Sequence, residues 1–140
     1  MAKEKSQSMI RWESSPGFVY FIGAHDPPIA IKIGISTQND IKRRFSTIQG
    51  GNHEQLFLLG VIPFDGGEKP MVAAMKREDE LHRHFGHIQH AEKGWAGSEW
   101  FAPSPELLAF IKNNTIEPSA RQLNRTIYRT KLNRTSNQAL

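Results

Sequence analysis

The chain has 140 residues, of which 38% are hydrophobic, so it can form one domain of ordinary size around a modest core. It has no cysteine, which excludes a disulfide framework and a thiolate metal site. The formal charge of +4 favours an anionic partner such as nucleic acid. No stretch approaches the roughly 20 apolar residues that span a bilayer, and no secretory signal is recognisable, so we expect a cytoplasmic protein without membrane contact.

Composition divides the chain into three parts. Residues 1–16 are polar and follow no sustained period, which predicts a disordered head. Core-forming residues crowd into the following segment, and we expect the folded domain to span residues 17–112. Residues 113–140 carry five basic residues and one acidic residue, which makes this segment a basic tail.

The basic tail has its charges at a helical spacing. Arg121, Arg125 and Arg129 recur every four residues, so a helix formed on contact would present one cationic stripe to a phosphate backbone. These arginines are therefore candidate nucleic-acid contacts. The alternative is a disordered tail that only improves solubility.

A hairpin is predicted at the start of the domain. Residues 17–23 are apolar and aromatic, which indicates a buried strand, and the two prolines in residues 24–28 indicate a turn. Residues 29–35 alternate strictly, as expected for a second strand. One face of this strand carries Ile29, Ile31, Ile33 and Ile35, and the other carries Ala30, Lys32 and Gly34.

The rest of the domain alternates between helical and extended patterns. Residues 39–49 have a helical period, and residues 55–64 are apolar enough for a third, central strand. A long helix is predicted at residues 69–85, then a loop with a short extended piece at residues 94–101. Ser104 and Pro105 begin a last helix. We therefore expect an α+β fold with a small three-stranded mixed sheet, in the order β-β-α-β-α-α, flanked by helices.

A carboxylate interrupts the apolar stripe of the long helix. The stripe comprises Met71, Ala74, Met75, Glu78, Leu81, His82 and Phe85. Burial of a carboxylate is costly unless a cation accompanies it, so Glu78 is either half of a structural salt bridge or a ligand of a hard divalent cation. His82 on the same stripe is a candidate site residue, and the alternative is a core histidine with a satisfied hydrogen bond.

The preceding helix carries three consecutive cations. Arg44 falls at the edge of its apolar stripe, where it can either pair with Glu78 or bind a phosphate through its planar guanidinium. Lys42 and Arg43 fall on the solvent side and are candidate contacts to nucleic acid.

Tyr20 and Lys32 lie in the middle of the two hairpin strands, where they can share one face. Taken singly, Tyr20 is an ordinary core tyrosine, and Lys32 belongs to the solvent-exposed face of an amphipathic strand. Several histidines follow the long helix, but zinc needs ligands that converge on one point, so we do not expect a zinc site.

At these residues the sequence resembles the GIY-YIG nuclease family. Phe18-Val19-Tyr20 is similar to the first family motif, and Lys32-Ile33-Gly34 is similar to the second, with lysine in place of tyrosine. Further motifs resemble a phage and bacterial branch of the family: Gln49-Gly50-Gly51-Asn52, then Glu78, Leu81, His82 and Phe85, then Gly97, Glu99, Trp100 and Phe101.

The resemblance implies a GIY-YIG-like fold that hydrolyses phosphodiesters with one divalent ion, Mg²⁺ or Mn²⁺. Tyr20 would help to activate the attacking water, Arg44 would neutralise charge on the scissile phosphate, and Glu78 would hold the metal. Lys32 would bind phosphate or act as a base, and His82 would support the site.

The expected function is therefore a metal-dependent DNA endonuclease that acts as a monomer or weak dimer. The alternative is a nucleic-acid-binding module with the same fold and weak or no cleavage, which the lysine at position 32 favours. A protein-binding role for Trp95, Trp100 and Phe101 is a more distant alternative.

Overall fold

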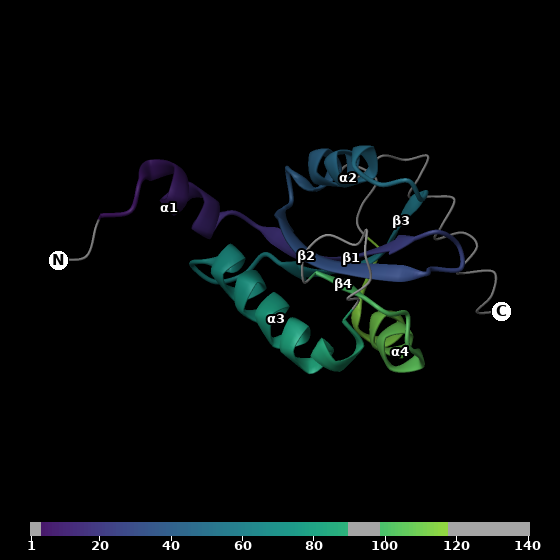
Figure 1. Cartoon of the computed structure of the whole chain (residues 1–140). Coiled ribbons are helices and arrows are strands. Elements are labelled where there is room, and N and C mark those ends of the chain that lie inside the picture. Colours follow the sequence, from purple (N-terminus) through teal and green to yellow (C-terminus); the bar gives the residue numbers. More distant parts are fainter. Residues whose placement is uncertain (1–3, 90–98, 118–140) are drawn as a thin grey trace.

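The computed structural model describes residues 4–89 and 99–117 (Figure 1). Its elements are α1 (Gln7–Ser14), β1 (Gly17–Ala24), β2 (Ala30–Thr37), α2 (Ile41–Gly50), β3 (Leu56–Phe64), α3 (Pro70–His84), the 3₁₀ turn η1 (Gly86–Ile88), β4 (Trp100–Phe101) and α4 (Pro105–Asn114). Within these ranges, no helix has both the length and the apolar character needed to cross a bilayer.

The described residues form an α+β fold, as expected, but the predicted three-stranded mixed sheet is wrong. The sheet has four strands in the order β3-β1-β2-β4, and every pairing is antiparallel. The additional strand is β4, which has only two residues and forms because it pairs with β2. β3 was expected in the centre, yet it lies at an edge, and the central position belongs to β1, which is buried along its whole length.

The two faces of the sheet carry separate apolar clusters. Side chains alternate along β1, so that Phe18, Tyr20 and Ile22 join one cluster with α2, while Val19 and Phe21 join the other with α3 and α4. Figure 1 shows α2 on one face and both α3 and α4 on the other. We call these the α2-side cluster and the α3-side cluster. The predicted alternation is confirmed for Ile31, Ile33 and Ile35, whereas Ile29 lies before β2 and is exposed.

The helices bury most of the predicted apolar residues. In α3, Met71, Ala74 and Leu81 are buried, whereas Met75 is 46% exposed, so its assignment to the stripe is wrong. Leu108, expected on the packing face of α4, is also exposed. α4 begins as predicted: the Ser104 hydroxyl accepts a hydrogen bond from the Leu107 amide at 3.1 Å, and Pro105 is the first helical residue.

The head was predicted to be disordered, but residues Gln7–Ser14 form α1. The Ser6 hydroxyl caps this helix by accepting from the Met9 amide at 3.1 Å, and Trp12 packs against the α3-side cluster. The helix buries no residue fully, so its sequence has no apolar stripe from which it could be predicted.

Candidate functional site

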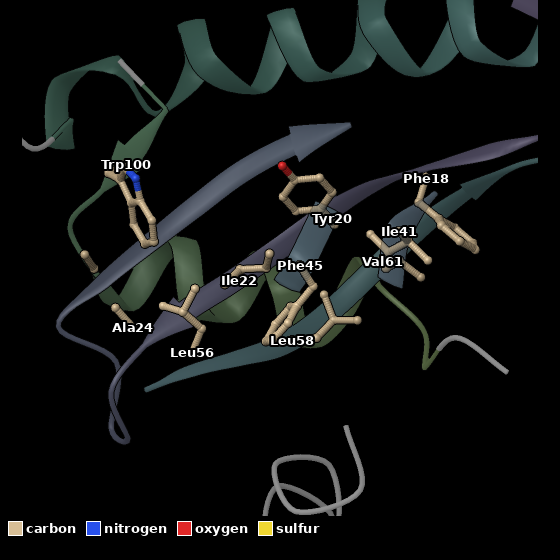
Figure 2. Packing of buried hydrophobic residues seen from close by; sticks show 11 residues of the cluster. Phe18, Tyr20, Ile22, Ala24, Ile41, Phe45, Leu56, Leu58, Val61 and Trp100 are labelled. Carbon is tan, nitrogen blue, oxygen red and sulfur yellow. The ribbon is translucent and has the colours of Figure 1, made fainter. Parts of the chain in front are cut away.

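The Tyr20 ring lies across β2 at a position that only glycine permits. Tyr20 pairs with Gly34 in the β1–β2 ladder, and a Cβ atom at Gly34 would overlap the phenol ring and its hydroxyl. In Figure 2 the hydroxyl points away from the apolar side chains of the α2-side cluster. Gly34 thus lets a buried tyrosine direct its polar end out of the core.

Burial raises the pKa of Tyr20 above its ordinary value of 10.0, so the phenol keeps its proton at neutral pH. Nearby charges also act on it: the positive charge of Arg44 lowers this pKa, and the carboxylates of Glu99 and Glu78 raise it. The field at the phenol therefore combines groups from α2, from the residue before β4 and from α3.

The backbone of Ile33 brings two further elements to the same place. Its amide donates to the Glu99 carbonyl at 3.0 Å, and its carbonyl lies 2.9 Å from His82 Nε2. β4 pairs with β2 only at Ile31 and Lys32, and α3 approaches β2 immediately beyond. Lys32, Ile33 and Gly34 of the second motif therefore lie at the point along β2 where its neighbour changes from β4 to α3.

Glu78 carries an open carboxylate one turn before His82. It is half-buried, and it makes no hydrogen bond or ion pair with any residue in the described ranges. Desolvation raises the pKa of Glu78 above its ordinary value of 4.5, and the charge of Glu99 raises it further, while His82 and Lys32 lower it. The alternative of a salt bridge between Glu78 and Arg44 is not observed there.

The cations of α2 differ in their surroundings. Arg43 is exposed and pairs with Asp40 at 2.7 Å, which holds the pKa of Asp40 below its ordinary value. Arg44 is also exposed, but its side chain makes no hydrogen bond or ion pair with the residues that the structure describes, although its charge acts on Tyr20. Lys42 is exposed as well. Arg44 is therefore available to an anion that approaches the Tyr20 phenol.

Lys32 is not simply a solvent-exposed residue on the polar face of its strand. Its ammonium forms an ion pair with Glu99 and lies 5.9 Å from the centre of the Trp100 ring. The Lys32 side chain is 12% exposed and that of Glu99 is 45% exposed. Sequence reasoning placed Glu99 in a motif but left it out of the site. The signal that points to it is an acidic residue beside two aromatic residues that pair with β2.

His82 makes the satisfied hydrogen bond that was its alternative interpretation. Because the Ile33 carbonyl can only accept, Nε2 of His82 carries the proton and donates. Its ring also meets Phe101 edge-on at 5.2 Å between centroids. Nδ1 is then the nitrogen that can accept a proton or hydrogen bond.

Other sequence-based candidates lie apart or beyond the described residues. His84 and His87 both face Glu106, at 3.0 and 3.7 Å, rather than His82. Across residues 4–89 and 99–117 no group of three histidine or acidic side chains is arranged to hold a metal ion. Arg121, Arg125 and Arg129 fall outside those ranges, as do Trp95 and Gly97.

Comparisons of the chain with protein-family models, with curated proteins and with solved structures gave no match.

The contact between Gly34 and Tyr20 gives a first prediction. Gly34→Ala should destabilise the protein by roughly 1–3 kcal/mol, because the added methyl group forces the buried ring to move. Urea unfolding measures this difference. Gly50→Ala is a matched control, because nothing lies within 4 Å of its added methyl group. Equal stability of the two variants would contradict the described packing.

Proposed function

We propose that this chain is a metal-dependent DNA endonuclease of the GIY-YIG type, which hydrolyses phosphodiester bonds beside Tyr20. The observation that carries the proposal is the convergence at this phenol. Groups from three elements far apart in the sequence, Arg44 on α2, Glu78 on α3 and Glu99 before β4, all act electrostatically on it. The side chains of two of them, Arg44 and Glu78, make no hydrogen bond or ion pair within the described residues. Burial raises the pKa values of Tyr20 and Glu78, and such perturbed groups beside an unpaired cation are typical of functional sites.

Glu78 is the residue that would hold the metal ion. Mg²⁺ keeps several waters and takes one or two carboxylates together with substrate phosphate, rather than a cage made only of protein ligands. A half-buried carboxylate with both oxygens open fits this mode. The bound ion would polarise the scissile phosphate and stabilise the leaving oxygen.

Tyr20 and Arg44 would act on the attacking water and on the phosphate. Because burial keeps the phenol protonated, Tyr20 positions the water through a hydrogen bond instead of serving as a phenolate base. Arg44 would bind the non-bridging oxygens, where negative charge grows in the transition state. Nδ1 of His82 takes no part in the bond to the Ile33 carbonyl and is our candidate to accept the proton of the water.

The proposed partner is DNA, which the protein would bind as a monomer or weak dimer in the cytoplasm. Lys42 and Arg43 are exposed on the same helix as Arg44, so they can contact the backbone next to the scissile phosphate. The tail arginines would extend this contact.

A binding module with weak or no cleavage is the second candidate. One observation favours it: the lysine that replaces the second motif tyrosine is already engaged by Glu99. Such a module would bind DNA with a steep salt dependence and leave the strands intact.

Nicking of supercoiled plasmid separates the two candidates. We expect nicking with Mg²⁺ or Mn²⁺, complete loss with excess EDTA, and recovery when Mg²⁺ is restored. Tyr20→Phe should lower the rate by roughly 10²–10⁴-fold, the range for a group that assists proton transfer. Salt-dependent binding without nicking by the unmodified chain would establish the binding module instead.

A further inference from the structure

The ion pair between Lys32 and Glu99 sits beside a carboxylate that the proposed function needs to be free. The charges of Lys32 and Glu99 both act on Glu78, in opposite directions. Lys32 nevertheless pairs with Glu99, and Glu78 has no ion pair in the described ranges. The site therefore contains two carboxylates and one buried ammonium, and the ammonium is committed to one of them.

Backbone contacts fix that choice. The Glu99 carbonyl accepts from the Ile33 amide at 3.0 Å, so the residue is anchored beside Lys32 before its side chain is considered. Trp100 pairs directly with Lys32 in the β2–β4 ladder, and its ring lies under the ammonium. The register of the β2–β4 ladder therefore places Glu99 beside Lys32, and the ion pair forms with Glu99.

We propose that Glu99 is a positioning residue that holds Lys32 away from Glu78 and so keeps the Glu78 carboxylate open for a divalent cation. This inference rests on the proposed function for its metal, but it concerns the competition between two cations for one carboxylate. Without Glu99, the flexible lysine stem would deliver its ammonium to Glu78, and the metal ion would have to displace it.

The test measures Mn²⁺ binding to the free protein by paramagnetic broadening of backbone amides, with no cleavage involved. Glu99→Gln should weaken binding by about tenfold, within the range of coupling between neighbouring groups. Lys32→Met should strengthen binding only modestly in the unmodified protein, because Glu99 already holds the ammonium, but it should restore binding fully to the Glu99→Gln protein. Glu106→Gln, which removes an exposed carboxylate paired with His84, is the matched control.

The outcomes are distinct. If Lys32→Met raises Mn²⁺ affinity by the same factor with and without Glu99, the two charges act independently and the positioning role is wrong, although the endonuclease proposal stands. If Glu99→Gln binds Mn²⁺ as tightly as the unmodified chain, the inference also fails alone. If the unmodified chain binds no better than Glu78→Gln, both the metal site and the inference fail. Restored binding in a chain that does not nick DNA would uphold the inference and overturn only the endonuclease.

Discussion

Glu78→Gln should slow nicking severely and leave the protein at least as stable at neutral pH. The loss in rate should be roughly 10³-fold or more, because a Lewis-acidic ion contributes several kcal/mol to a phosphoryl transition state. Stability should not fall, because the substitution removes a half-buried negative charge that has no ion-pair partner among the described residues. Plasmid nicking and urea unfolding measure the two effects.

The stability difference should also depend on pH. The pKa of Glu78 is raised in the folded state, so the folded protein binds this proton more tightly than the unfolded chain does. The contribution of Glu78 to the stability of the unmodified protein, relative to the Glu78→Gln variant, should therefore rise as pH falls through the folded pKa towards the ordinary value of 4.5. Any advantage of the glutamine variant should be largest at neutral pH and vanish at low pH.

Asp79→Asn is the control for this series, because Asp79 is exposed and pairs with Arg83 on the solvent side of α3. It should nick DNA at the unmodified rate. A glutamine variant that nicks as fast as this control would remove Glu78 from the metal site.

Arg44→Ala should lower the nicking rate by roughly 10²–10³-fold, the usual effect of removing one group that stabilises transition-state charge. Arg44→Lys should recover only part of this, because an ammonium lacks the planar fork of the guanidinium. Stability should change little, since Arg44 is exposed and makes no ion pair within the placed residues. Single-turnover kinetics with DNA in excess of its dissociation constant isolates the chemical step.

Arg43→Ala provides the contrast on the same helix. Arg43 is paired with Asp40 and is proposed only as a backbone contact, so its loss should weaken DNA binding and reduce the salt slope by about 1. Equal losses in the chemical step from Arg43→Ala and Arg44→Ala would show that α2 acts only as a cationic surface.

The periodicity of apolar residues was sufficient to predict the strands whose alternating pattern matches their burial. The alternation of β1 and β2 follows directly from the apolar residues on each face, and it places Tyr20 and Lys32 on the face of the α2-side cluster. Glu78 and Arg44 stood out because polar residues occupied or bordered apolar stripes. Their unpaired state could not be read from the sequence, since a salt bridge satisfies the same pattern.

The remaining features depend on contacts between distant segments. For β4 the sequence predicted only a short extended piece within residues 94–101. Its register with β2, which decides that Glu99 meets Lys32, could not be read from that pattern. α1 has a cap and one packed tryptophan, Trp12, but no apolar stripe to predict it. The edge position of β3 follows from its antiparallel pairing with β1, which a single apolar run does not specify.

The central claim is that Tyr20, Arg44 and Glu78 form one site for metal-assisted phosphodiester hydrolysis. The most direct test is the single-turnover nicking rate of the double variant Arg44→Ala/Glu78→Gln, measured with Mg²⁺ beside both single variants and the unmodified chain. Residues that act as a unit lose their effects together, so we expect the double variant to be no slower than Glu78→Gln. Losses that multiply, or an unmodified chain that does not nick DNA, would contradict the account.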